Sequence, residues 1–181
     1  MRFTEDLIKY KKYSGKSTLV LLLTQQGLWA LFCYRFFNKI YRSKLPKLFK
    51  NILLLWGVFS QKYIEILTGI QLPYSATVGR QFYIGHFGGI IINANAVIGH
   101  NCNISQGVTI GVSGRGAHRG VPVIGDHVYI GANATIAGNI TIGNNAVIGA
   151  NSLVVKDVDE ATTVVGVPAQ VVSSNDSKGY I

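Results

Sequence analysis

Four histidines are the side chains of this sequence best matched to take a proton from a hydroxyl group near neutral pH. His86 begins the run His-Phe-Gly-Gly, where a regular repeat is interrupted, and His118 lies in a glycine-rich insert of the same repeat. Such a break marks a place where something other than packing is required. His100 and His127 take variable positions of their repeats, so we expect them at exposed corners. His86 and His118 are the candidate catalytic histidines. The alternative for His86 is an exposed corner residue, and the alternative for His118 is an ordinary loop residue.

The repeat that these histidines interrupt has a period of six residues. An aliphatic residue, which we call an anchor, returns at that interval at Ile124, Ile130, Ile136, Ile142, Ile148 and Val154. A small residue follows most of these anchors. This period fits neither an amphipathic helix nor an alternating strand. It is typical of a hexapeptide β-helix, a solenoid with one short strand per repeat. Ordinary strands joined by glycine turns would not keep six anchors in register.

The same register extends toward the N-terminus and is interrupted twice. Its earlier anchors are Val78, Ile84, Ile92, Ile98, Ile104 and Ile110. A slip of two residues falls between Ile84 and Ile92, and residues 112–121 are an extra glycine-rich, basic segment, which we expect to be a loop leaving the coil. Three sides make a coil of about eighteen residues, so the stretch from Val78 to Val165 predicts about four coils.

Positive charge is concentrated in the first third of the chain. Up to Lys62 there are 12 Lys and Arg against 2 acidic residues, a balance of +10, and from Tyr63 onward there are 5 against 6, or −1. This asymmetry indicates that the basic segment binds either a membrane surface or nucleic acid. Apolar residues dominate between the charges, so we expect no nucleic acid partner. Cys33 and Cys102 form no disulfide or metal-binding pattern, which favours a reducing cytoplasm and no metal.

The first third is also apolar and is expected to be helical. Ser17 caps a predicted helix that runs to Arg42, and Pro46 begins a second one that ends near Ile66. Neither has the unbroken apolar length of a membrane span. One interpretation is a hairpin on the cytoplasmic face of a membrane, with aromatic residues such as Phe37 in the interface and basic ones such as Arg35 on anionic lipid. The other is that these helices cap the end of the coil.

Four segments carry a resemblance to a known family. They are Ile84-Gly-His-Phe-Gly-Gly, Gln106-Gly-Val-Thr-Ile-Gly, His118-Arg-Gly-Val-Pro and Val165-Gly-Val-Pro-Ala. They resemble the hexapeptide-repeat acyltransferases over about residues 70–172, in particular the serine acetyltransferase-like branch that includes exopolysaccharide and capsule O-acetyltransferases. The resemblance implies a mainly β fold, a left-handed parallel β-helix with an N-terminal α-helical segment. It also implies a homotrimer with active sites between subunits and acetyl-CoA as co-substrate in a groove between coils.

The resemblance further implies roles for individual residues. His86 would be the general base that takes the proton of the acceptor hydroxyl, and His118 a second active-site histidine. Ala132 and Ala150 would border the pantetheine arm of acetyl-CoA and Lys156 its phosphates, although the alanines could equally fill the core and the lysine lie free on the surface. The residues expected to contact the acceptor are Gln71, Asn93, Gln106 and Arg119.

Two positions depart from the pattern of serine acetyltransferases. These enzymes carry an aspartate fifteen residues before the general-base histidine, where this chain has Gln71, and another directly before it, where this chain has Gly85. The neutral amide of Gln71 could position an imidazole but would not stabilise an imidazolium as a carboxylate does, and Gly85 has no side chain to pair with the amino group of serine. We therefore expect an O-acetyltransferase acting on a saccharide in surface polysaccharide biosynthesis. The alternatives are a serine O-acetyltransferase of cysteine biosynthesis and a non-catalytic trimeric β-helix scaffold.

The predicted organisation has three parts. Residues 1–68 form a basic, apolar helical segment that either binds a membrane surface or caps the coil. Residues 69–172 form the acyltransferase domain with the inserted loop 112–121, and residues 173–181 form a C-terminal tail. The expected location is the cytoplasm, with the chain free or peripheral on the inner face of the membrane.

Overall fold

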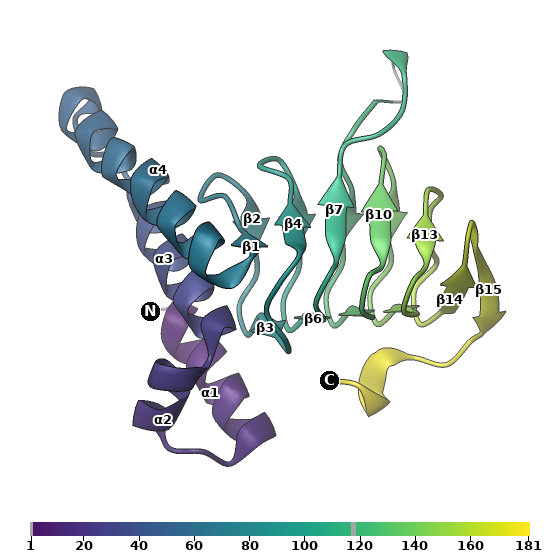
Figure 1. Ribbon diagram of the computed structural model, residues 1–181. Coiled ribbons are helices and arrows are strands. Elements are labelled where there is room, and N and C mark those ends of the chain that lie inside the picture. The colour runs from purple at the N-terminus through teal and green to yellow at the C-terminus, as the bar shows by residue number, and fades with distance from the viewer. Residues whose placement is uncertain (1, 117–118) are drawn as a thin grey trace.

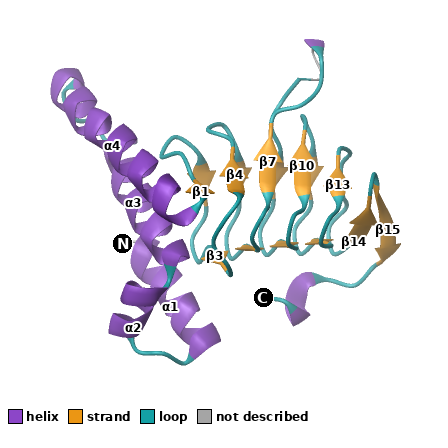
Figure 2. Cartoon of the chain, viewed as in Figure 1, coloured by secondary structure: helices purple, strands orange, loops and turns teal. Residues whose placement is uncertain are grey.

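The computed structural model describes residues 2–116 and 119–181. Four helices precede a coil of short strands and pack at one end of it (Figure 1). Figure 2 shows the same division, with the α-helices on one side and the strands on the other. The helices are α1 (Arg2–Ser14), α2 (Thr18–Thr24), α3 (Gln26–Tyr41) and α4 (Lys47–Thr68).

The strands of the coil form three sheets. One sheet contains, in order, β1 (Ile70–Gln71), β4 (Ile90–Ile92), β7 (Thr109–Gly111), β10 (Thr135–Ala137) and β13 (Leu153–Val154). The second contains β11 (Thr141–Ile142), β8 (Val123–Ile124), β5 (Val97–Ile98) and β2 (Thr77–Val78). The third contains β15 (Ala169–Ser173), β14 (Thr163–Gly166), β12 (Val147–Ile148), β9 (Tyr129–Ile130), β6 (Asn103–Ile104) and β3 (Tyr83–Ile84).

Pairing between successive coils follows the repeat. Thr135 pairs with Leu153, eighteen residues later. The slip lengthens the first coil to twenty residues, from Ile84 to Ile104, and the insert lengthens a later one to twenty-six, from Ile104 to Ile130. Neighbouring strands are parallel except for the final pair, β14 and β15. The predicted parallel β-helix with an N-terminal helical segment is therefore confirmed, and its left-handedness stays a prediction.

The aliphatic anchors fill the interior of the coil. All twelve, from Val78 to Val154, are at most 2% exposed. Anchors of successive coils are paired with one another, as Ile136 is with Val154, and all of them belong to one buried cluster. Fully burying such a side chain contributes about 1.5–3 kcal/mol, so this stack is the main source of stability in the coil.

The helical part differs from its prediction in two places. The stretch predicted as one helix from Ser17 to Arg42 is two helices, α2 and α3, that meet at 90°. Gln25 has an extended backbone at the junction, and Ser17 caps α2 as expected by accepting a hydrogen bond from the Val20 amide. The polar segment before Ser17 is also a helix, α1. The second predicted helix is confirmed as α4, and Gly69 ends it with a φ of 65°.

Side chains of α3 bind the exposed edge of the first coil. The Tyr34 hydroxyl donates to the Ala76 carbonyl at 2.9 Å and accepts from the Val78 amide at 3.0 Å. Asn38 donates from Nδ2 to the Tyr74 carbonyl at 2.7 Å. A sheet edge offers unpaired backbone groups that are costly to bury without partners. Helix α3 supplies those partners where no preceding coil exists.

A buried ion pair joins α1 and α3 to the same edge. The Arg35 guanidinium contacts the Asp6 carboxylate at 2.8 Å and donates to the Val78 carbonyl at 2.7 Å, and Asp6 accepts from the Phe82 amide at 2.9 Å. Arg35 is 6% exposed, so the prediction that it faces lipid is wrong. The prediction for Phe37 is wrong as well, because this ring is buried against Gly57 of α4.

The C-terminal tail returns along the sheet that ends in β15 (Figure 1). It contains a short 3-10 helix, η2 (Ser177–Gly179). The Tyr180 ring stacks on Tyr129 with centroids 4.6 Å apart, and the Tyr180 carbonyl accepts from Asn103 Nδ2 at 2.8 Å. These contacts place the tail beside successive coils rather than beyond the last one.

Candidate active site

His86 is exposed at a bend two residues after strand β3. Ile84, the last residue of this strand, is bound by Tyr10 of α1 through two hydrogen bonds. The Tyr10 hydroxyl donates to the Ile84 carbonyl at 2.9 Å and accepts from the Ile84 amide at 3.0 Å. Burial raises the pKa of the Tyr10 phenol far above its usual range, so the hydroxyl keeps its proton. The position of His86 therefore depends on a residue of the helical segment.

A cavity of about 290 Å³ opens beside His86, between the coil and the helices. Its lining residues come from α1, α2, α3 and the β3 bend: Tyr10, Ser14, Leu21, Gln25, Gln26, Gly27, Tyr83, Ile84, Gly85, His86 and Phe87. Among these lining residues, none is acidic and none is Lys or Arg. The cavity thus offers an imidazole, amides and hydroxyls, which suits an acceptor with an uncharged hydroxyl-bearing group next to His86.

Gly27 sets the distance between α3 and the strand that precedes His86. A Cβ at this position would lie 2.3 Å from the Tyr10 hydroxyl and 3.0 Å from the Ile84 carbonyl oxygen. Both of those groups are already fixed by the hydrogen bonds between them. Only glycine therefore allows the start of α3 to pack this closely, and the cavity owes its shape to that approach.

The contribution of α1 to the site was not predicted from the sequence. The signal that could have found it is the spacing of Phe3, Leu7 and Tyr10, which recur at intervals of four and three as on one face of a helix. This face is interrupted by Asp6, a carboxylate that needs a partner when it is buried. Charge and polarity in the rest of the segment concealed this pattern.

Four of the predicted site residues share one corner of the coil. Ile84, Ile104, Ile130 and Ile148 are paired in successive strands, and the residues two positions later are His86, Gln106, Ala132 and Ala150. Gln106, Ala132 and Ala150 form a row along this corner, and His86 lies in the slip beside it, where Gly88 is the residue in register with Gln106. We name His86 and these three residues the His86 row. The backbones are close there, since a Cβ on Gly131 would lie 2.6 Å from the Ala150 amide nitrogen. Small side chains leave that backbone uncovered beside the histidine.

The other predicted residues of the coil lie at the opposite ends of the strands. Asn93 follows β4, and its side-chain oxygen, Oδ1, accepts a hydrogen bond from the Asn95 amide at 2.9 Å within a local turn. Lys156 follows β13 and is exposed at the edge of a 130 Å³ cavity. Arg119 is exposed on the insert, which leaves the coil after β7 (Figure 1). One chain therefore does not bring these three residues to the His86 row.

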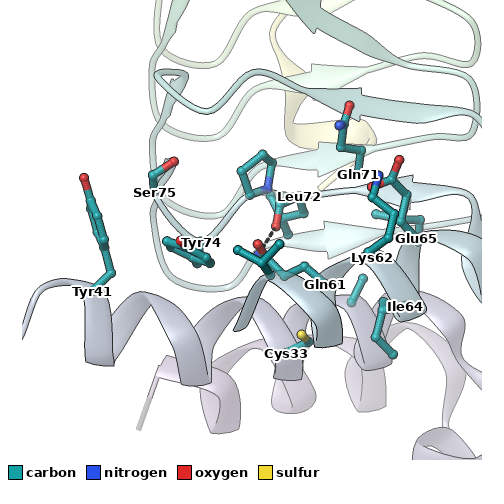
Figure 3. A pocket seen from close by; sticks show the side chains of 14 residues that line it. Cys33, Tyr41, Gln61, Lys62, Ile64, Glu65, Gln71, Leu72, Tyr74 and Ser75 are labelled. Atoms are coloured by element: carbon teal, nitrogen blue, oxygen red, sulfur yellow. Dashed lines mark hydrogen bonds and ion pairs between the residues drawn. The ribbon is translucent and has the colours of Figure 1, made fainter. Parts of the chain in front are cut away.

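Gln71 is separated from His86 as well. It lies in β1 and lines a different cavity, of about 360 Å³, together with Gln61, Lys62 and Glu65 of α4 (Figure 3). Among the described residues, no hydrogen bond joins the Gln71 amide to the His86 imidazole. In β1 the neighbouring Ile70 points into the core, so Gln71 faces outward. Its role toward the acceptor stays a prediction.

The remaining histidines are placed as follows. His118 lies outside the described residues. His100 and His127 are exposed at corners, as predicted, where His100 Nδ1 accepts from the Arg80 amide at 2.9 Å. In the two described ranges, no three His, Cys, Asp or Glu side chains come together as metal ligands. His86 is the described histidine that borders the cavity between coil and helices.

Comparison with known proteins places the chain in a family. Residues 122–156 match the bacterial transferase hexapeptide family (six repeats). The chain is 36% identical over 165 residues to the serine acetyltransferase of Bacillus pumilus (strain SAFR-032), which covers 91% of this chain and 72% of that enzyme. The chain belongs to the hexapeptide acyltransferase family. It is an acyltransferase enzyme with acetyl-CoA as the donor.

Solved structures of this acyltransferase family have the same fold. The serine acetyltransferase of Neisseria gonorrhoeae matches with a TM-score of 0.82 and 35% identity, over 95% of this chain and 64% of that one. A serine acetyltransferase in complex with CoA matches with a TM-score of 0.80 and 29% identity, over 94% and 68%. Because these relatives are serine acetyltransferases, the predicted exopolysaccharide branch is not supported.

Proposed function

We propose that this acyltransferase moves the acetyl group of acetyl-CoA to the hydroxyl of L-serine, with His86 as general base. The observation that carries the proposal is the match to serine acetyltransferases over 91% of the chain, which includes the helices that border the His86 cavity. O-acetylation of a saccharide, the function expected from the sequence, thereby becomes the second candidate function.

In the proposed reaction, His86 takes the proton from the acceptor hydroxyl as its oxygen attacks the thioester carbonyl carbon. The bond from that carbon to sulfur then breaks, and the proton passes from the imidazolium to the leaving thiolate, which gives CoA and the O-acetyl product. A hydroxyl is a weak nucleophile at neutral pH, so a positioned base typically contributes 10²–10⁴-fold. The His86 imidazole is exposed and borders the cavity, so it is accessible to an acceptor hydroxyl.

The binding of acetyl-CoA is proposed along the His86 row. Ala132 and Ala150 leave space for an extended pantetheine arm, and Lys156 supplies a cation for phosphate groups. Lys156 and the insert lie across the sheet from this row within one chain. A homotrimer, in which a corner of one chain lies beside another chain, would bring these groups together and place the active sites between subunits.

A second candidate acceptor is an uncharged polyhydroxyl compound such as a saccharide. The observation in its favour is the lining of the His86 cavity, where the described residues offer no carboxylate to the ammonium group of serine. Gln25 and Gln26 have amide groups that, within the described chain, make no side-chain hydrogen bond. Such amides bind sugar hydroxyls without a charge.

The deciding experiment measures thiol release from acetyl-CoA by the purified protein. L-serine is compared with L-alanine, which lacks the hydroxyl, and with a panel of neutral mono- and oligosaccharides. We expect release with L-serine and none above background with L-alanine. Release with a saccharide alone would replace serine by the second candidate. Failure to bind acetyl-CoA at millimolar concentration would instead indicate a scaffold.

A further inference from the structure

Helix α4 carries a second apolar face that the fold does not cover. Its packed side is marked by Gly57, which lies against Phe37 of α3. The opposite side carries apolar residues at intervals of three and four, from Ile52 at 52% to Leu48 at 78% exposed: Leu48, Ile52, Leu55, Phe59, Tyr63 and Ile66. We name these six residues the α4 outer face. A continuous apolar surface of this length marks an interaction site.

The α4 outer face continues onto the neighbouring helices through an apolar groove. The groove has a volume of about 690 Å³ and is lined by Leu22 of α2, Phe32 and Phe36 of α3, and Tyr63 of α4, among other residues. Because Tyr63 belongs to both, groove and face form one surface over three helices. None of the described helices is by itself long and apolar enough to cross a membrane, and α2 with α3 reaches that length only across the 90° bend.

Basic residues border this surface, and the one acidic residue of α4, Glu65, is paired with Lys62 at 2.8 Å. From Leu7 to Ile64 the sequence has 11 Lys and Arg and no Asp or Glu. Lys39 follows Phe36 by one turn of α3, and Lys44 and Lys47 stand where α4 begins; all three are exposed. Arg35 is the basic residue of this stretch that a carboxylate neutralises inside the fold. The surface therefore combines apolar side chains with a positive border.

We propose that the α4 outer face and its groove dock on an anionic lipid bilayer. Apolar and aromatic residues enter the boundary between headgroups and acyl chains, while Lys39, Lys44 and Lys47 contact lipid phosphates. A second copy of the chain fits less well, because its matching surface presents lysines and no free carboxylates to the first, and like charges would face each other. This inference stands independently of the acceptor.

The test is flotation of the full-length protein with vesicles. We expect strong flotation with vesicles that contain phosphatidylglycerol, weak flotation with pure phosphatidylcholine, and a decrease as salt is raised. Leu55→Glu/Phe59→Glu should abolish flotation. The matched control, Val171→Glu/Val172→Glu on the exposed end of the coil, should float like the unaltered protein.

A charge variant tests the border separately. Lys39→Gln/Lys44→Gln/Lys47→Gln should lower partition into the anionic vesicles by about a hundredfold, because each lysine contributes about fivefold. The exposed Lys178→Gln should have no effect. The proposal is overturned if the unaltered protein does not float, or if the face variant floats like its control. It is also overturned if light scattering shows that Leu55→Glu/Phe59→Glu halves the mass of the particle, since a second copy then covers the face.

Discussion

The coil and helix α4 place their regularly spaced apolar side chains in opposite environments. In the coil, anchors six residues apart all point inward and are at most 2% exposed. On α4, residues three and four apart form an outer face whose side chains are more than half exposed. Regular spacing thus identifies the side chains that share a face. Whether that face is covered depends on what the rest of the fold brings against it.

Buried polar side chains distinguish the interior of the coil from the junction between the helices and the coil. Within the coil, backbone amides pair with the next coil, and the anchors need no polar partner. At the helix–coil junction, Asp6, Tyr10, Tyr34 and Arg35 bury their polar groups to complete the first edge. The stability of the coil therefore resides in its repeated interior, whereas the geometry around His86 resides in a few specific hydrogen bonds.

The largest effect should come from the buried ion pair at this junction. Arg35→Met leaves the Asp6 carboxylate buried without its cation, and we expect the free energy of unfolding to fall by about 3–5 kcal/mol in urea denaturation. The matched control is Lys62→Gln, which removes an exposed pair with Glu65 and should cost less than about 1 kcal/mol. Equal effects would show that the junction does not hold the helices on the coil.

A pair of truncations compares the two apolar patterns directly. Ile136→Ala removes a fully buried anchor and should lower the free energy of unfolding by about 2–5 kcal/mol. Phe59→Ala removes a larger side chain from the α4 outer face and should change it by less than about 0.5 kcal/mol in the absence of lipid. A large loss for Phe59→Ala in the isolated protein would mean that this face is covered in solution.

Much of the coil could be predicted because its cause is local and repeated. Each anchor follows the last by six residues, as Ile130 follows Ile124, and the insert only lengthens one coil, so that Ile104 pairs with Ile130. The bend at Gln25 could not be predicted in this way. Apolar residues continue through it, and the bend coincides with packing of Gly27 against Tyr10 and Ile84, which are distant in sequence.

The candidate site was predictable only in part for the same reason. His86 stood out because the repeat slips there. The partners that shape its cavity come from α1 and the start of α3, and Asp6 lies 29 residues from Arg35 in the chain. A charged residue inside the apolar run from Leu28 to Phe37 was nevertheless a usable signal, since an arginine in such surroundings is rarely buried unpaired.

A smaller effect is expected at Lys9, whose ammonium group is buried without a hydrogen-bond partner among the described residues. Burial lowers its pKa from the ordinary 10.5 to about 8. Between these values the unfolded chain binds more protons, so this group makes the free energy of unfolding rise as pH increases from 8 to 10.5. Lys9→Met should lack that rise and be more stable at pH 7 by about 1–3 kcal/mol. Parallel pH profiles for the two proteins would contradict this.

The smallest of these effects concerns the fit of α3 beside the site. Gly27→Ala should push α3 away from Tyr10 and Ile84 and lower acetyl transfer by roughly tenfold, about 1.4 kcal/mol in the barrier. Gly179→Ala, at a glycine with open space around it, is the control and should transfer normally. Unchanged transfer in Gly27→Ala would show that the helices tolerate displacement without affecting His86.

The most direct test of the account is the rate of acetyl transfer by His86→Ala beside His100→Ala. Both remove an exposed histidine from a corner of the coil, but only His86 borders the cavity between coil and helices. With the accepted hydroxyl compound and saturating acetyl-CoA, we expect His86→Ala to lose at least about a hundredfold in turnover and His100→Ala to keep the rate of the unaltered protein. Turnover by His86→Ala within a few-fold of the unaltered protein would contradict the assignment of the general base.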